Sequence, residues 1–331
     1  MSKNITLPML LLLLLLCGCS QDENKALNSE TRFLLDTACT VSADCDDETL
    51  SGAFAVCEEL ERLLSRTVKG SDVYRLNETD GFVSVSDDTL RLLEKSVYYG
   101  NLTDGKFDIT VCPVSELWDF KNQIVPSRSE IAEALKNVDY HSIEIKENTA
   151  NLNGKKIDLG GIAKGYTSSR VMQIFKEYGI EHGMVNLGGN VQTLGTKTDG
   201  TAWRVAIQSP QGGNQYLGIL ETSNQAVITS GGYERYFEEN GVTYHHIIDP
   251  KTGYPSDSDL TSVTIVCADG TKADALSTSF FVMGLQKAES FYENTDLDFD
   301  VILLTKDNQI YISEGIAQNF TSDYTVNVLK K

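Results

Sequence analysis

Asp274 and Thr278 lie four residues apart in the stretch KADALSTSF, residues 272–280. In the helix that we expect from about Lys272 to Met283, this spacing places both side chains on one face. A carboxylate and a hydroxyl are hard oxygen ligands, and Mg²⁺ prefers such ligands. Spacing alone favours a structural role, in which the aspartate suits the first helical turn and the threonine bonds back to a carbonyl.

The stretch IDLGGIAKGY, residues 157–166, combines three glycines with a cation. Gly160, Gly161 and Gly165 allow tight turns and a close approach of the backbone to a ligand. A helix follows, and the free N–H groups of its first turn favour an anion. Lys164 lies in that turn, where its charge opposes the helix dipole, so the pattern suggests an anionic partner. The pattern is also typical of a strand-to-helix turn with a surface lysine.

Two of the four histidines of the chain are neighbours in TYHHIIDPKTGYP, residues 243–255. If 243–248 is a strand, Tyr244, His246 and Ile248 share one face and His245 lies on the other, so the histidines cannot act as a pair on one substrate. A near-neutral imidazole at the end of a strand suits a general base. The alternative is a histidine that only makes cross-strand hydrogen bonds.

The segment GKFDITVCPVSELWDF, residues 105–120, contains Asp108 within a strand-like apolar run. A buried acid needs a partner, and Phe107 and Trp118 are suited to line a pocket for a ring-shaped ligand. The alternative is a core strand with one capped acid. VNLGGNVQTLG (185–195) and TSGGY (229–233) are interpreted as glycine-rich turns between strands.

The elements that must position these residues follow from periodicity. RFLLDTACTV, residues 32–41, is interpreted as a first strand, and helices are predicted over 47–65, 86–99 and from a capping box at Ser127–Glu130. The helix after IDLGGIAKGY is expected to run to about Tyr178 and to stop at Gly179. A hairpin is expected from strands at 141–146 and 149–153, and further strands at 183–187, 203–208, 216–221, 225–229, 243–248, 260–266, 299–304 and 309–313.

This mixed order of elements predicts an α+β fold with mixed or antiparallel sheets and packed helices. No strand is followed by GxGxxG and GxxxxGK[ST] is absent, so Rossmann and P-loop folds are excluded. The 331 residues contain 41% apolar and 23% charged residues, which is ordinary for a globular protein. The formal net charge of −19 argues against nucleic-acid binding, and it means that an anionic substrate needs a local cation.

The N-terminus reads as an export signal. Lys3 is followed by an apolar run, Met9–Leu16, which is shorter than the roughly 20 residues that span a bilayer. Cys19 follows Leu-x-Gly, which resembles a bacterial lipobox, so we expect residues 1–18 to be a lipoprotein signal peptide and Cys19 to be lipidated. An ordinary signal peptide is the alternative. Residues 19–30 are then a tether and residues 31–331 the folded domain.

The five later cysteines include no CxxC pair, so neither a zinc site nor a disulfide framework is indicated. A single Cys39–Cys45 bridge remains open, and cysteines used as small apolar residues are the preferred interpretation.

Taken in order, several segments resemble the ApbE-type FAD:protein FMN transferases. They run through nearly all of the mature chain, from about residue 32 to 313. The combination of DLGGIAKGY, HIIDPxTGxP and ADALST is the most specific part. The segments are SDVYRLNE, GKFDITVCPVSELWDF, IDLGGIAKGY, VNLGGNV, WRVAIQSP, TSGGYERYF, HIIDPKTGYP and ADALST.

The resemblance implies a two-lobed, T-fold-related domain that binds FAD in a cleft and, with Mg²⁺, transfers FMN to a Thr or Ser hydroxyl of a partner protein while AMP leaves. It implies His246 as the general base and three metal ligands, namely Asp274, Thr278 and the carbonyl of Gly161. It implies flavin and nucleotide contacts at Leu35, Lys106, Phe107, Asp108, Asp158, Lys164 and Ile248.

The chain departs from the family pattern at Leu35-Asp36-Thr37, where Met-Gly-Thr is common, and at Thr67, where a tyrosine is common. Both departures touch the flavin end of the site. FAD hydrolysis to FMN and AMP, and non-catalytic flavin binding by a lipoprotein, are the alternative functions. SGAF, residues 51–54, faintly resembles a flavin acceptor, but its helical spacing makes Phe54 a core residue.

The expected partners are FAD and exported flavoproteins of membrane electron-transfer complexes. The expected location is a lipid anchor on the extracytoplasmic side of a bacterial membrane.

Overall fold

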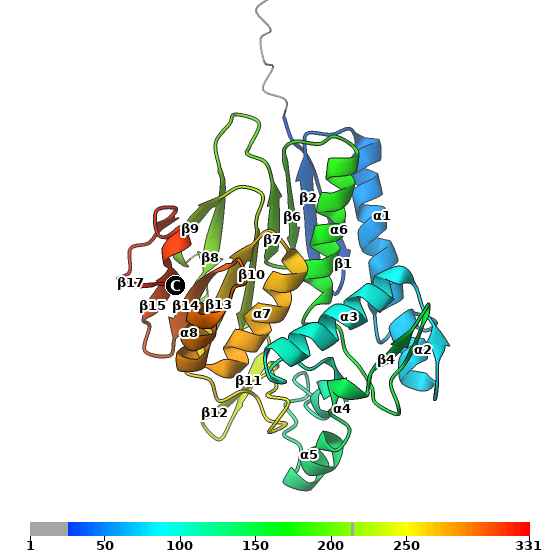
Figure 1. Ribbon diagram of the computed structural model, residues 1–331. Coiled ribbons are helices and arrows are strands. Elements are labelled where there is room, and N and C mark those ends of the chain that lie inside the picture. Colours follow the sequence, from blue (N-terminus) through cyan, green and yellow to red (C-terminus); the bar gives the residue numbers. More distant parts are fainter. Residues whose placement is uncertain (1–25, 213–214) are drawn as a thin grey trace, which may run out of the picture.

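The computed structural model describes residues 26–212 and 215–331, so the predicted signal peptide and Cys19 lie outside the described residues. One large sheet organises the chain (Figure 1). In spatial order its strands are β1 (Asn28–Leu34), β2 (Thr37–Ala43), β6 (Gly183–Leu187), β7 (Asn190–Leu194), β10 (Ala226–Gly231), β13 (Leu260–Cys267), β14 (Asp300–Thr305), β15 (Ile310–Ser313) and β17 (Val326–Leu329).

Neighbouring strands of this sheet are antiparallel, except that β15 and β17 are parallel. Three small sheets accompany it. They are β3 (Val83–Ser84) with β5 (Thr149–Asn151) and β4 (Glu144–Lys146); β11 (Tyr236–Glu239) with β12 (Val242–His245); and β16 (Phe320–Thr321) with β9 (Tyr216–Thr222) and β8 (Trp203–Gln208). The predicted α+β class with mixed and antiparallel sheets is confirmed.

The helices are α1 (Asp47–Leu64), α2 (Asp72–Glu78), α3 (Asp87–Leu102), α4 (Cys112–Ser115), α5 (Arg128–Leu135), α6 (Ala163–Glu177), α7 (Gly270–Met283) and α8 (Leu285–Asn294), with short 3-10 turns η1 (Ile109–Val111), η2 (Tyr140–Ser142) and η3 (Glu314–Ile316). Figure 1 shows α1, α6 and α7 along the large sheet, and α2 to α5 gathered at its lower end.

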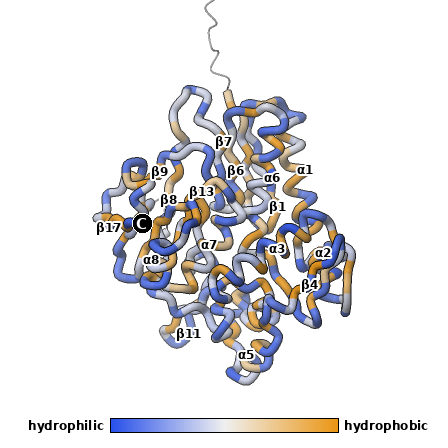
Figure 2. Tube along the Cα trace, viewed as in Figure 1, coloured by the Kyte–Doolittle hydropathy of each residue, from blue (hydrophilic) through white to orange (hydrophobic). Residues whose placement is uncertain are grey.

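The large sheet has a hydrophobic core on each face, because side chains alternate along its strands. On β10, Ile228 packs with the helices in the core that also contains Phe280 of α7. Its neighbour Val227 points to the opposite core, which contains Leu220 of β9. Figure 2 shows hydrophobic residues concentrated along the central strands around β13, and mostly hydrophilic outer loops. The sheet is therefore the middle layer between helices and the β8–β9–β16 sheet.

Local sequence signals explain the predicted helices. Ser127 and Glu130 form the expected reciprocal capping box at the start of α5. α6 ends at Glu177, just before Gly179, which has a φ of 71°. The hairpin β4–β5 turns at Glu147, as predicted.

The interpretation of residues 32–41 as one strand is wrong. Leu35 and Asp36, with φ of 54° and 57°, turn the chain between β1 and β2, whose residues pair from Asn28↔Ala43 to Leu34↔Thr37. A leucine with a positive φ, in the left-handed region of backbone conformation, costs free energy. The N–H of Leu35 donates to Glu61 Oε1 at 3.0 Å, which supports the turn. The hairpin also begins at Asn28, so the last residues of the predicted tether lie in a strand.

The strand-like interpretation of residues 105–120 is wrong as well. Asp108 caps the helical turn η1, which continues into α4, by accepting a hydrogen bond from the N–H of Thr110 at 2.7 Å. A helical turn satisfies the carboxylate locally, which an apolar strand cannot do.

The strand predicted over 243–248 ends at His245. Cys39, Cys57, Cys112 and Cys267 are buried thiols, as expected for small apolar residues.

Candidate active site

The start of α6 lies directly against α7. The N–H of Gly165 donates to Asp274 Oδ2 at 2.8 Å, and Asn190 Nδ2 donates to Asp274 Oδ1 at 3.3 Å. A Cβ at Gly165 would lie 2.1 Å from the carbonyl oxygen of Gly270, so only glycine allows this approach. The helix pair thereby holds the carboxylate of Asp274, which is 4% exposed, in one orientation.

One helical turn further along α7, Thr278 lies beside Gly161. A Cβ at Gly161 would be 3.6 Å from Thr278 Oγ1 and 3.4 Å from the ring of Phe107. Ser230 Oγ, at the end of β10, is 3.3 Å from Thr278 Oγ1. The fold therefore gathers all three residues predicted as metal ligands, Gly161, Asp274 and Thr278, where α6 begins.

This donor set fits a hard divalent cation. Each oxygen of Asp274 accepts one hydrogen bond, and a carboxylate offers about four lone-pair positions, so each oxygen keeps capacity for a metal. Across residues 26–212 and 215–331, no three His, Cys, Asp or Glu side chains are grouped to hold a metal. The candidate set of Gly161, Asp274 and Thr278 includes only one such side chain, because its other two candidate donors are a hydroxyl and a backbone carbonyl.

His246 follows β12 and is oriented by one carbonyl. Arg235 O accepts the backbone N–H of His246 at 3.1 Å and lies 3.3 Å from His246 Nδ1. If Nδ1 donates to this carbonyl, it carries the ring proton and Nε2 keeps its lone pair. The side chain is partly buried. Burial, followed by the nearby charge of Arg235, lowers the pKa of His246 to about 4, so the imidazole is neutral at pH 7.

His245 occupies a different environment. Its Nε2 lies 3.1 Å from Ser256 O. Its ring packs edge-to-face against the ring of Phe281, with centroids 5.2 Å apart. Its Nδ1 is buried and has no hydrogen-bond partner within the described part of the chain. Tyr244, by contrast, packs beside Trp118, with ring centroids 5.4 Å apart. The two histidines lie in different environments. The strand on which the prediction was based ends at His245, so strand alternation does not account for their separation.

Lys106 forms an ion pair with Asp249, in the turn after His246. Lys106 Nζ lies 3.3 Å from Asp249 Oδ2, and the side chains are only 19% and 16% exposed. Asp249 also shapes its own turn, since its carbonyl accepts the N–H groups of Thr252 and Gly253. The sequence analysis assigned Asp249 no role in the site. Its partner lies 143 residues away, and no local signal identifies it.

Asp158 is held by an arginine that sequence reasoning missed. Arg66 Nε donates to Asp158 Oδ2 at 2.8 Å, and Arg66 Nη1 donates to Glu116 Oε1 at 2.6 Å. Asp158 Oδ1 accepts the N–H of Gly160 at 2.8 Å. Thr67, one of the departures from the family pattern, follows Arg66 in the chain. Its Oγ1 lies 3.1 Å from Ser65 Oγ.

Lys164 carries a positive charge into the same region. Its Nζ lies 3.4 Å from Gly160 O. Burial raises the pKa values of Cys39 and Glu234 and lowers that of His246, and the charge of Lys164 makes a smaller, lowering contribution to all three. The β1–β2 turn reaches this end of the sheet too, since a Cβ at Gly188 would clash with Thr37. Leu35 is partly buried beside the α1–α6 core.

Three further predicted contacts are packing residues in this structure. Phe107 and Ile248 are 4% and 6% exposed, and Ile248 packs with Trp118. Asp108 is 9% exposed, and burial raises its pKa. Phe107 and Asp108 follow Lys106 in the chain, and Ile248 precedes Asp249, so all three lie next to the Lys106–Asp249 ion pair in sequence.

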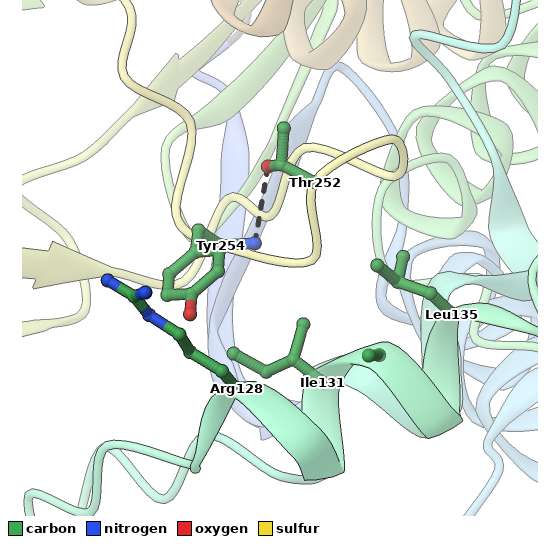
Figure 3. A pocket seen from close by; sticks show the side chains of 6 residues that line it. Arg128, Ile131, Leu135, Thr252 and Tyr254 are labelled. Atoms are coloured by element: carbon green, nitrogen blue, oxygen red, sulfur yellow. Dashed lines mark hydrogen bonds between the residues drawn. The ribbon is translucent and has the colours of Figure 1, made fainter.

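A shallow pocket lies behind the turn at Asp249 (Figure 3). Ile131 and Leu135 of α5 face Thr252 and Tyr254 across it, and the N–H of Tyr254 donates to Thr252 Oγ1 at 3.3 Å. None of the predicted site residues lines this pocket, so it is distinct from the α6–α7 site.

Comparison with known proteins places this arrangement in context. Residues 35–303 match the model of the ApbE family. The chain is 33% identical over 277 residues to the FAD:protein FMN transferase of Klebsiella pneumoniae, covering 81% of this chain and 85% of that one. It is 31% identical over 289 residues to the Treponema pallidum protein of the same name, covering 81% and 80%.

Solved structures agree. The ApbE protein from Thermotoga maritima superposes with a TM-score of 0.82 at 34% identity, covering 88% of this chain and 99% of that one. The flavin transferase ApbE from Vibrio cholerae superposes with a TM-score of 0.79 at 27% identity, with the same coverage.

Proposed function

The chain belongs to the ApbE family and is an enzyme of the transferase class, and from that premise we propose that it transfers FMN from FAD to a Ser or Thr hydroxyl of a partner protein and releases AMP. The relatives named FAD:protein FMN transferase support flavin transfer. The proposal adds two details to flavin transfer: the reaction depends on Mg²⁺, and the acceptor group is a hydroxyl.

The observation that carries the proposal is the convergence of Asp274, Thr278 and Gly161 at the start of α6. Bound there, Mg²⁺ would neutralise charge on the pyrophosphate of FAD. Lys164 adds a positive charge beside Gly160. The protein as a whole carries −19, so an anionic substrate depends on such a local site.

His246 is the proposed general base. Its Nε2 accepts the proton of the acceptor hydroxyl while the carbonyl of Arg235 holds Nδ1. The hydroxyl oxygen forms a bond to the FMN phosphorus, the bond from that phosphorus to the bridging oxygen breaks, and AMP leaves with that oxygen. Phosphoryl-type transfer needs mainly positioning and charge stabilisation. Lys106 and Asp158, each fixed by an ion pair, are proposed to orient FAD.

Water in place of the acceptor hydroxyl would turn the same site into an FAD pyrophosphatase that yields FMN and AMP. The experiment incubates the protein with FAD, MgCl₂ and a candidate acceptor, then denatures the mixture. Equal amounts of AMP released and flavin retained on the acceptor support transfer. An acceptor with its Ser or Thr changed to Ala is the matched control. AMP release without retained flavin would overturn transfer in favour of hydrolysis, and flavin binding without AMP would indicate a non-catalytic flavoprotein.

The proposed location is a membrane surface, with Cys19 lipidated on the extracytoplasmic side and exported flavoproteins as acceptors. The leader pattern at Met9–Leu16 and Leu-x-Gly-Cys supports this. Among the described residues, no helix is long and apolar enough to cross a bilayer. Radiolabelled palmitate incorporated by wild type and lost in Cys19→Ala would support the anchor, and equal labelling of both would contradict it.

A further inference from the structure

Arg66 joins three segments that are far apart in the sequence. It comes just after Ser65, the C-cap of α1. Arg66 donates to Asp158 at 2.8 Å across 92 residues, and to Glu116 at 2.6 Å across 50 residues. The three side chains are 34%, 35% and 43% exposed, so solvent and a ligand can reach them. Because a guanidinium is planar and rigid, two contacts from different edges fix its plane.

Asp158, which accepts the hydrogen bond from Arg66, also makes contacts within the loop that precedes α6. Asp158 uses its other oxygen, Oδ1, to accept the N–H of Gly160 at 2.8 Å, and its own N–H donates to Ile109 O at 2.9 Å. Gly160 is followed directly by Gly161, beside Thr278. Asp158 is therefore fixed at both carboxylate oxygens and at its backbone.

The residue before Asp158 is fixed independently. Asn77 Nδ2 donates to Ile157 O at 2.9 Å, and the N–H of Ile157 donates to Asn77 Oδ1 at 2.8 Å. The backbone of this segment therefore does not depend on Arg66 for its position. What Arg66 adds is a hydrogen bond to the second carboxylate oxygen of Asp158, Oδ2, which completes the orientation begun by Gly160, and a positive charge beside it.

We propose that Arg66 is a positioning residue that aims the Asp158 carboxylate at bound FAD, with Glu116 holding the guanidinium through Nη1. This inference rests on the proposed function, which makes Asp158 a contact of FAD. Arg66 itself takes no part in bond breaking, so its loss should weaken FAD binding and leave the chemical step nearly intact.

The test compares wild type with Arg66→Ala, Arg66→Lys and Glu116→Gln. FAD affinity is measured without Mg²⁺ by quenching of flavin fluorescence, and KM and kcat by AMP release with Mg²⁺. Poor orientation of one hydrogen bond between Asp158 and FAD predicts roughly five- to tenfold weaker binding and higher KM in Arg66→Ala, with kcat within about twofold. Arg66→Lys should fall in between, because an ammonium cannot contact both acids in the same geometry. Glu116→Gln keeps the Asp158 contact and should change KM less than Arg66→Ala.

Arg62→Ala is the matched control, because Arg62 lies one turn earlier and pairs with Glu59 on the surface of α1. It should leave FAD affinity and KM unchanged. The inference is overturned if Arg66→Ala binds FAD like wild type, whatever its melting temperature, or if Arg62→Ala weakens binding equally. Wild type that binds FAD but releases no AMP would overturn the proposed function alone. Wild type that does not bind FAD would overturn both.

Discussion

The carbonyl oxygen of Arg235 lies within 3.3 Å of both the backbone nitrogen and the ring Nδ1 of His246. One acceptor therefore constrains the backbone and the side chain of the same residue. Within residues 26–212 and 215–331, a carbonyl and not a carboxylate orients the imidazole, and burial lowers its pKa. A neutral ring with a free Nε2 is the expected state at neutral pH, and the first two predictions depend on it.

His246→Ala should reduce kcat for FMN transfer by about 10²- to 10⁴-fold, because a general base typically contributes that much. FAD affinity should change little. His245→Ala is the comparison, since His245 packs on Phe281 and should affect the melting temperature more than kcat. Transfer at the wild-type rate in His246→Ala would refute the assignment.

The pKa of about 4 for His246 predicts the pH dependence. The base works when unprotonated, so kcat/KM for FAD should not fall on account of His246 until the pH drops towards about 4. Arg235→Ala removes a positive charge that lowers this pKa, so its acid limb should move to higher pH. Arg204→Ala, an exposed arginine near Glu221, is the control. Circular dichroism at each pH separates protonation from unfolding, and a wild-type limb near pH 6.5 would contradict the prediction.

Gly165→Ala should destabilise the fold by about 1–3 kcal/mol or more, because its Cβ would lie 2.1 Å from Gly270 O, a backbone atom. Gly52→Ala is the matched helical control. Its Cβ has no neighbour within 4 Å, and replacing an exposed helical glycine should stabilise by up to about 1 kcal/mol. Urea denaturation measures both free energies of unfolding. Equal free energies of unfolding for the two variants would contradict the prediction, because they would show that α6 and α7 can move apart with little loss of stability.

Asp274→Asn keeps the shape of the side chain and removes its charge. We expect the Mg²⁺ concentration for half-maximal AMP release to rise at least about tenfold, because the carboxylate is the only charged member of the donor set. Asp269→Asn, at the N-cap of the same helix, should lower the melting temperature and leave the Mg²⁺ requirement unchanged. Activity in excess EDTA equal to that in Mg²⁺ would show that the reaction does not need the metal.

Periodicity and capping signals predicted the long helices around the candidate site, and α7 contains Asp274 and Thr278 at the i,i+4 spacing that the sequence predicts for one helical face. The β1–β2 turn was missed because Leu35 and Asp36 form it without glycine or proline, and the supporting Glu61 lies in α1. Arg66 and Asp249 were missed because their site partners are 92 and 143 residues away. Local sequence indicates which side chains are chemically suited to a site, whereas only the folded structure shows which of them lie in contact.

The β1–β2 hairpin has a mechanical consequence. β1 leads from the N-terminal end of the described domain towards the turn at Leu35, at the end of the sheet where the site lies. Seven residues at about 3.3 Å each make it a spacer of about 23 Å. If Cys19 carries a lipid, the proposed site would lie at the end of β1 that is farther along the chain from the anchor. Acceptor proteins in the same membrane would then need to present their hydroxyl on a segment that reaches that end of β1.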